Sequence, residues 1–253
     1  MCTVVVLRRP GHDWPLILAA NRDEMTGRAW LPPARHWPDR AEVIAGQDEL
    51  AGGTWLGLND WGVIAAILNR PGSLGPDAER RSRGELPLEA LDHAEAAVAA
   101  KAMAAVDPDS YRSFNLVIAD AHLAFWIKSD GAGKPITAAA IPDGVSIITA
   151  HDLNDATAPR IARFKPKFEA ARPPDIKAGD WAEWQALMAD TGGDAPMTFT
   201  TEETGAKGGF ATVSSSLLAL PDPVRAMERG NLRPQWLFAP GRPDKTPYAA
   251  VEI

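Results

Sequence analysis

The sequence predicts an α+β fold in which mainly antiparallel sheets are covered by helices. The first apolar segments are joined by short turns of the kind found in hairpins, and helical segments stand between groups of strands instead of after every strand. With 45% of its 253 residues hydrophobic, the chain can bury a sizeable core. We therefore expect a single domain over residues 1–253, and not a doubly wound parallel sheet.

Four strands are predicted in the N-terminal part of the chain. Residues 2–9 ("CTVVVLRR") and 16–24 ("LILAANRDE") are apolar runs on either side of the turn sequence "PGHDWP". Residues 54–58 and 63–68 flank the turn "NDWG", and a Pro-Gly break follows Asn69. Each pair of strands is therefore expected to lie around its turn.

The middle of the chain is expected to hold a loop, a helix and further strands. Residues 30–37 ("WLPPARHW") contain a proline pair and no periodicity, which indicates a loop. Residues 86–106 are rich in alanine with few helix breakers and predict a helix. Residues 115–131 predict two strands around a tight turn, and residues 144–155 predict a strand that runs into a polar corner.

Helical patterns return in the last third of the chain. They cover residues 160–171 and 180–190, and Asp180 is a candidate cap for the second helix. A strand at residues 211–220 then precedes a proline-rich tail.

Charge and hydropathy exclude several classes of partner. The net charge of −7 provides no general attraction to nucleic acid or to an anionic membrane. No apolar stretch approaches the roughly 18 residues of a membrane span. The N-terminal apolar run is too short for a signal peptide, and a single cysteine cannot form an intramolecular disulfide. We expect a cytoplasmic protein whose partner is a small molecule.

The only cysteine of the chain stands at position 2 and is the first candidate for chemistry. If Met1 is removed, as is common ahead of a small residue, Cys2 carries both a thiol and the free α-amine. A thiolate is a strong nucleophile, and an α-amine with a pKa of about 7.7 to 8.0 can take its proton at neutral pH. The alternative is that Cys2 is a small hydrophobic residue that opens a buried strand.

Polar residues at the ends of later strands are the next candidates. "NRDE" spans Asn21 to Glu24, and pairing with the first strand would bring Arg22 and Asp23 near the thiol. There a guanidinium would lower the thiol pKa and a carboxylate could orient the amine. The alternative is a surface ion pair worth about 0 to 1 kcal/mol.

Two further strand ends carry polar side chains. Asn69 can donate its amide to a developing oxyanion, or it can be a turn residue before Pro-Gly. His151 and Asn154, in "TAHDLND", can form a second polar wall of the same pocket, or cap the helix that follows. Metal binding and phosphate-loop chemistry are not indicated: the five histidines stand far apart, and HxxxH, CxxC, Walker A, GxGxxG and GxSxG patterns are missing from the sequence.

The motifs "MCT", "AANRDE" and "GGTWLGLNDWGVIAAILNRPG", in this order, resemble the NRDE family, also called the transport and Golgi organisation protein 2 family. The resemblance is specific over roughly the first 70 residues and continues more loosely through "SFNLVIAD", "SIITAHDLNDATAPRI" and "GFATVSSSLLAL". That family resembles the N-terminal-nucleophile hydrolases. The resemblance therefore implies a four-layer αββα sandwich.

The resemblance also implies an activity. Cysteine amidases of the penicillin V acylase and bile salt hydrolase kind also begin Met-Cys-Thr. By analogy Cys2 is the nucleophile and its own amine the base, Arg22 and Asp23 position them, and Asn69 helps to hold the oxyanion. The expected substrate is a small amide that is not a peptide. We expect the substrate pocket to include Asn21, Glu24, Trp55, His151 and Asn154.

Three departures from the acylases concern the pocket. The acylases separate their Arg and Asp by two residues, whereas Arg22 and Asp23 are adjacent, so their side chains cannot both face Cys2. His151 stands where the acylases have Asn, and Val213 stands where relatives often carry Arg.

The alternative function is a binding or carrier protein on the same fold. Its ligand would be haem or a lipid or acyl-CoA molecule, with Cys2 or a histidine as a candidate axial ligand to haem. The hydrolase reading requires no cofactor.

Overall fold

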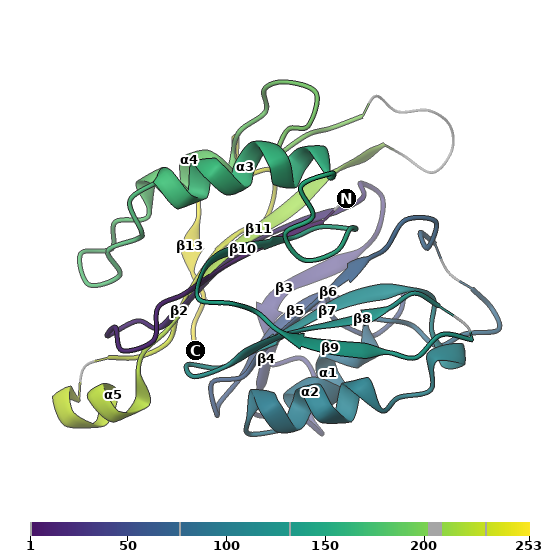
Figure 1. The fold of residues 1–253 in the computed structure, drawn as a ribbon, viewed down its shortest axis with the longest axis horizontal. Helices are drawn as coiled ribbons and strands as arrows, with labels where there is room; N and C mark the ends of the chain where they lie inside the picture. Colours follow the sequence, from purple (N-terminus) through teal and green to yellow (C-terminus); the bar gives the residue numbers. More distant parts are fainter. Residues whose placement is uncertain (1, 76, 132, 202–208, 231) are drawn as a thin grey trace. The chain divides into compact units, whose positions relative to one another are not determined.

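The computed structural model describes residues 2–75, 77–131, 133–201, 209–230 and 232–253. The chain divides into two compact units, each built on one antiparallel sheet (Figure 1). The first unit combines the chain up to Arg28 with Asp143–Ile253, and the second unit is Ala29–Pro142. The predicted α+β class and the predicted antiparallel pairing are confirmed.

Within the described ranges, the first unit contains a six-stranded sheet. In spatial order its strands are β10 (Gly144–Ile148), β1 (Thr3–Arg8), β2 (Leu16–Met25), β11 (Phe210–Leu220), β12 (Gln235–Ala239) and β13 (Ala249–Ala250). β1 and β2 pair with Thr3 opposite Asn21, which confirms the first predicted hairpin. The strands predicted within residues 144–155 and 211–220 are confirmed as β10 and β11.

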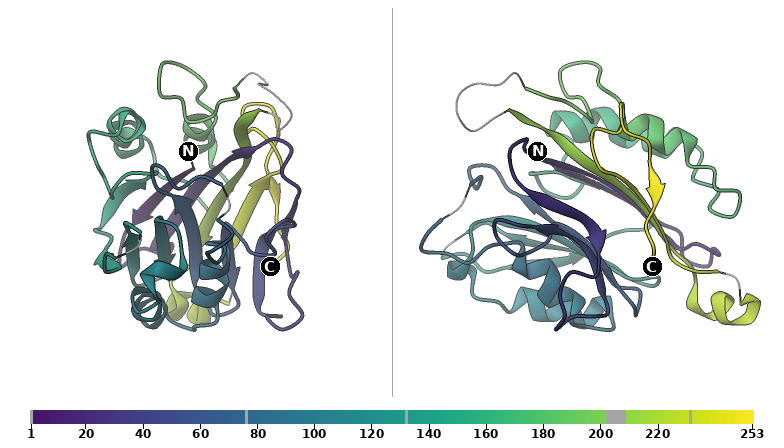
Figure 2. Two further views of the ribbon diagram at one scale, coloured as in Figure 1. Left: turned by 90° about the vertical axis from the view of Figure 1, so that its right-hand side faces the viewer. Right: turned by 180° about the vertical axis from the view of Figure 1, so that it is seen from behind.

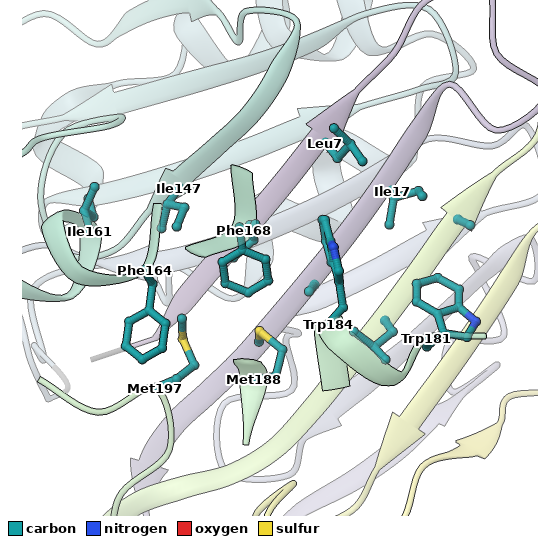
Figure 3. Packing of buried hydrophobic residues seen from close by; sticks show 14 of the residues in the cluster. Leu7, Ile17, Ile147, Ile161, Phe164, Phe168, Trp181, Trp184, Met188 and Met197 are labelled. Atoms are coloured by element: carbon teal, nitrogen blue, oxygen red, sulfur yellow. The ribbon is translucent and has the colours of Figure 1, made fainter. Parts of the chain in front are cut away.

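Two helices lie along one face of this sheet (Figures 1 and 2). They are α3 (Pro159–Ala170) and α4 (Ala182–Met188), and both were predicted. Figure 3 shows the core that they cover, which includes Phe164, Phe168, Trp184, Ile17 and Ile147. Full burial of each such side chain contributes about 1.5 to 3 kcal/mol. This apolar layer holds the strands that carry the N-terminal end of the chain.

Side-chain alternation gives the sheet two different faces. Val5 of β1 and Ile17 of β2 belong to the core under α3 and α4, so we call this side the helix-covered face. Because alternate side chains of a strand point the same way, Thr3 and Asp23 continue the helix-covered face. Arg22 therefore lies on the opposite face.

Within the described residues, the second unit contains a seven-stranded sheet. Its strands in spatial order are β3 (Trp30–Ala34), β4 (Val43–Asp48), β5 (Leu56–Asn59), β6 (Ile64–Asn69), β7 (Phe114–Ala119), β8 (Ala124–Ser129) and β9 (Thr137–Ala140). Helices α1 (Glu85–Leu91) and α2 (Ala96–Ala104) pack on one face of this sheet, and a short 3₁₀ turn, η1 (Pro108–Ser110), leads into β7. The strands predicted around "NDWG" and within residues 115–131 are confirmed, although β5 begins only at Leu56.

The prediction of a loop at residues 30–37 is wrong, because Trp30–Ala34 form β3. β3 is the edge strand of its sheet and pairs with β4 through a register shift. A proline has no N–H to donate, which matters little on an edge strand whose outer side has no neighbour. The proline pair therefore marks an edge and not the absence of a strand.

The prediction of one helix over residues 86–106 is also wrong, because α1 ends at Leu91 and α2 begins at Ala96. The side-chain amide of Asn59 donates to the carbonyl oxygens of Leu91 and His93, both at 2.8 Å. At the start of α2, the Ala96 N–H donates to the Asp120 carboxylate at 2.9 Å. Side chains from the sheet thus satisfy the backbone groups that a helix break leaves open.

Other elements have weak signals in the sequence. The strands β4, β9, β12 and β13 and the helix α5 (Pro223–Arg229) were not predicted. The N-cap of α4 is Trp181, but the Asp180 carboxylate accepts the Ala182 N–H at 3.1 Å, close to its expected capping role. In the described part of the chain, no helix combines the length and apolar composition that crossing a membrane requires.

Candidate active site

Cys2 lies directly before β1 and is held by the backbone of Asp23 in β2. The Asp23 N–H donates to the Cys2 sulfur at an N···S distance of 3.4 Å, and the thiol donates to the Asp23 carbonyl oxygen at 3.5 Å. Because Thr3 is opposite Asn21, Cys2 comes next to Arg22 at the end of the antiparallel pair. The thiol and the Arg22 side chain therefore share the face opposite α3 and α4.

The surroundings of the thiol favour its protonated form. Burial raises the pKa of Cys2 above its ordinary value, and the negative charge of Asp23 raises it further. The Asp23 N–H and the Arg22 guanidinium act in the opposite direction, but they do not reverse the shift. A nucleophile in this position needs a base to remove its proton at neutral pH.

Arg22 belongs to a row of alternating charges. Its side chain is buried, and its guanidinium lies 4.0 Å from the Glu24 carboxylate. Arg28 approaches the same carboxylate at 3.9 Å. Arg22 and Glu24 share one face of β2 because they are two residues apart, so Glu24 orients the guanidinium beside the thiol.

The Asp23 side chain lies on the helix-covered face and is fully buried. Thr212 of β11 donates its hydroxyl to one carboxylate oxygen at 2.7 Å. Arg160 of α3 donates from one nitrogen to the other carboxylate oxygen at 3.1 Å and to the Thr3 hydroxyl at 2.8 Å. Asp23 thus contacts Cys2 through its backbone, while its carboxylate binds on the other side of the sheet.

Arg160 and Thr212 were not among the predicted site residues. Arg160 does leave a signal, because it stands in the first turn of α3, where the helix dipole disfavours a positive charge. An arginine at such a position requires an acidic partner. Thr212 left no comparable signal in the sequence.

A β-bulge at Val213 explains how Thr212 reaches Asp23. The pairing of β11 with β2 sets Thr212 opposite Asp23 and Ser214 opposite Arg22, with Val213 as the extra residue. A bulge shifts the alternation of side chains by one residue. Thr212 and Ser214 therefore lie opposite consecutive residues of β2, although Val213 stands between them.

Asn21 and Asn154 anchor the fold. Asn21 is 1% exposed, and its amide donates to the carbonyl oxygens of Met188 and Met197, both at 3.0 Å. Asn154, at a φ of 56°, accepts the Ile147 N–H at 2.9 Å through its side chain. It thereby closes the free edge of β10.

His151 lies at the corner after β10. Its ring nitrogen Nδ1 is 3.9 Å from the Asp155 carboxylate, and its side chain is 35% exposed. The backbone N–H of His151 donates to the Thr149 hydroxyl at 3.3 Å. The imidazole therefore keeps access to solvent, unlike the two anchoring asparagines.

Trp55 and Asn69 belong to the second unit. A Cβ atom built on Gly46 would lie 2.3 Å from the Trp55 ring, so only glycine fits beneath that ring, and Trp30 meets it edge to face at 5.7 Å. Asn69 is the last residue of β6, opposite Phe114. In the part of the chain that the structure describes, the half-buried Asn69 amide has no hydrogen-bond partner.

The structure thus brings Cys2, Arg22, Asp23 and Glu24 together at one end of β1 and β2. Asn21 lies next to them in β2 but is used in the core. Across the described residues, no group of three or more histidine, cysteine or acidic side chains is arranged to hold a metal ion.

The sequence matches the family described as Transport and Golgi organisation 2 over residues 1–188. The Transport and Golgi organization protein 2 homolog of Bos taurus is 38% identical over 117 residues, which cover 43% of this chain and 40% of that protein. The homolog of Homo sapiens is 36% identical over 114 residues, with the same two shares. These matches span less than half the length of the curated relatives.

Solved structures show the fold. The Caenorhabditis elegans ortholog of N-acylethanolamine-hydrolyzing acid amidase matches with a TM-score of 0.60 at 12% identity, over 88% of this chain and 96% of that chain. A mutant of the conjugated bile acid hydrolase from Clostridium perfringens matches with a TM-score of 0.51 at 11% identity, over 100% and 97%. Penicillin V acylase from Agrobacterium tumefaciens matches with a TM-score of 0.50 at 13% identity, over 94% and 83%. The chain has the fold of N-terminal-nucleophile hydrolases, as the family resemblance implied.

Proposed function

Because the chain belongs to the Transport and Golgi organisation 2 family and has the fold of N-terminal-nucleophile hydrolases, we propose that it is a cysteine amide hydrolase with Cys2 as its nucleophile. The observation that carries this proposal is the placement of the thiol. Its sulfur accepts the Asp23 N–H and lies on the same face as the buried Arg22. Both donors stabilise a thiolate more than a thiol.

The proposed reaction begins after removal of Met1, when the α-amine of Cys2 takes the thiol proton. The thiolate attacks the amide carbonyl carbon, and a C–S bond forms as the carbonyl oxygen gains negative charge. The amine returns the proton to the leaving nitrogen, and the C–N bond breaks to give a thioester and a free amine. Water, deprotonated by the same α-amine, then attacks the thioester and releases a carboxylic acid and the thiol.

The other site residues have supporting roles in this proposal. Arg22 stabilises the thiolate, and Glu24 orients Arg22. Asn69 keeps the role that the resemblance implies, donation of its amide to the oxyanion. The substrate is proposed to be a small N-acyl compound, since the names of the solved proteins include an N-acylethanolamine-hydrolyzing amidase and a penicillin V acylase. The reducing cytoplasm is the proposed location, because it keeps a single thiol reduced.

The test begins with an intact mass of the purified protein, followed by a screen of small N-acyl amides and lactams. We expect Met1 to be missing, and we expect hydrolysis that Cys2→Ala abolishes. The matched control is Arg163→Met, because Arg163 is a second arginine of α3 and pairs with Asp190. Retention of Met1, or hydrolysis by Cys2→Ala at the wild-type rate, would contradict the proposal.

The predicted alternative, a carrier for haem or a lipid or acyl-CoA ligand, is tested on the same purified protein. Added haem would then give a Soret band that a substitution of one axial ligand removes. Such a band, together with an absence of hydrolysis, would replace the hydrolase proposal by the carrier.

A further inference from the structure

We propose that Arg160 is a positioning residue for the Cys2 thiol: it fixes Thr3 and Asp23 on the helix-covered face, and thereby fixes the backbone groups that hold the sulfur. The inference rests on the proposed role of Cys2 as a nucleophile. Its test follows the chemistry of the thiol and needs no substrate. A failure of Arg160 to matter is therefore distinguishable from an absence of hydrolysis.

Arg160 contacts both β1 and β2 at the residues next to the thiol. A single guanidinium nitrogen donates to the Thr3 hydroxyl at 2.8 Å and to the Asp23 carboxylate at 3.1 Å. Thr3 is the residue after Cys2, and Asp23 is the residue whose N–H and carbonyl oxygen both contact the sulfur. Movement of either residue changes the N–H···S geometry, so Arg160 controls it from the opposite face.

The guanidinium is itself held from two sides. It stands in the first turn of α3, which packs on the sheet, and its carbon Cζ lies 5.6 Å from the centre of the Phe199 ring. The Phe199 backbone pairs with Thr212, which is the second donor to Asp23. Arg160, Thr212 and Phe199 thus form one connected support for the Asp23 carboxylate.

The charges add an electrostatic effect to this mechanical one. The charges that act on the thiol are the Asp23 carboxylate on the helix-covered face, the N-terminal amine and the Arg22 guanidinium, with Glu24 beyond Arg22. Of these, the Asp23 charge raises the pKa of the Cys2 thiol, and Arg22 lowers it. Arg160 pairs with Asp23 from behind, so it offsets the one acidic group that opposes formation of the thiolate.

The experiment measures the alkylation rate of Cys2 by iodoacetamide between pH 7 and pH 10.5, followed by intact mass. The chain has one cysteine, so every thiol adduct is assigned without digestion. We expect Arg160→Met to raise the apparent thiol pKa by about one unit. This makes alkylation below that pKa about tenfold slower, because only the thiolate reacts. Arg160→Lys keeps the charge and should stay within about threefold of the wild-type rate.

Two further variants separate positioning from general stability. Thr3→Val together with Asp23→Ala removes both acceptors of the Arg160 guanidinium, so adding Arg160→Met to that protein should change the rate by less than about threefold. Arg163→Met, on the same helix, should leave the profile unchanged, because the partner of Arg163 is Asp190 and not a residue that contacts the thiol. A purely structural Arg160 would lower the unfolding midpoint without shifting the pH profile.

A wild-type alkylation profile in folded Arg160→Met overturns the proposal, and so does an equal effect of Arg160→Met with and without the Thr3→Val and Asp23→Ala substitutions. If Arg160→Met does not fold, Arg160→Gln replaces it. Glutamine is two side-chain atoms shorter than arginine and carries no charge, so it replaces neither the reach to Thr3 and Asp23 nor the charge beside Asp23. The same upward shift of the thiol pKa is expected, and an unshifted profile in Arg160→Gln overturns the proposal equally.

Discussion

Asn21→Ala tests whether this residue lines a pocket or anchors the core. Its amide donates to the carbonyl oxygens of Met188 and Met197, both at 3.0 Å. The Met188 carbonyl keeps a second donor, the Thr198 hydroxyl at 2.7 Å. Losing the bond from Asn21 to this carbonyl therefore costs about 0.5 to 1.5 kcal/mol. The Met197 carbonyl is left without that donor in a buried position, which costs about 1 to 3 kcal/mol.

A smaller opposing contribution comes from the Asn21 side-chain oxygen. It is buried and has no partner among the described residues, so alanine also removes a cost of about 1 kcal/mol. The balance is a loss of about 2 kcal/mol in the free energy of unfolding. For a chain of this size that corresponds to a decrease in Tm of about 4 to 8 °C.

The assay is urea unfolding of Asn21→Ala beside Asn69→Ala, with hydrolysis or ligand binding measured on the same samples. Asn69 is the matched control, since its amide has no partner in the described residues and its loss should cost no more than about 0.5 kcal/mol. A lower urea midpoint at an unchanged slope is expected for Asn21→Ala alone. An Asn21→Ala protein of wild-type stability that has lost its activity would refute the anchoring role and restore Asn21 to the pocket.

Three further outcomes are expected. The raised pKa of Cys2 stabilises the fold below the pKa of the unfolded thiol, and this contribution is lost as pH rises through the folded pKa. Urea midpoints between pH 7.5 and 10 should therefore fall more steeply for wild type than for Cys2→Ser, and parallel curves would contradict the shift. Gly46→Ala should lower the free energy of unfolding by about 1 to 3 kcal/mol, because its methyl group meets the Trp55 ring, and an unchanged urea midpoint would mean that the ring moves at no cost. Asn154→Gly should destabilise the protein less than Asn154→Ala, because both lose the side-chain bonds but only glycine adopts a φ of 56° without strain; equal losses in thermal unfolding would show that the backbone conformation is unimportant.

The predictable part of the fold is the part with local signals. The hairpin of β1 and β2 has two apolar runs and a turn sequence between them, and the structure pairs them in that way. The proline pair of β3 predicts a loop, but β3 is an edge strand, where a missing N–H is tolerated. The break between α1 and α2 depends on Asn59 and Asp120, which come from the sheet and leave no mark in the alanine-rich segment itself.

Some residues of the candidate site could likewise be predicted from local signals, and others could not. Cys2 and Arg22 could be placed together from strand pairing alone, because their proximity depends on one hairpin. Asn21 could not be separated from a pocket residue, since an asparagine at a strand end serves a ligand or a buried carbonyl equally well. Its acceptors, Met188 and Met197, are far away in the sequence. Only the tertiary structure decides between the two uses.

Because Arg22 and Asp23 are adjacent, their side chains lie on opposite faces of the sheet and have different roles. With one residue on each face, the Asp23 carboxylate lies on the face opposite the sulfur, where it binds Arg160 and Thr212. Asp23 still serves the thiol, but through the N–H that its carboxylate holds in place. In the proposed reaction, this leaves the α-amine as the base and Arg22 as the buried charge beside the sulfur. The bulge at Val213 makes the contact between Thr212 and the Asp23 carboxylate possible, because it sets Thr212 opposite Asp23.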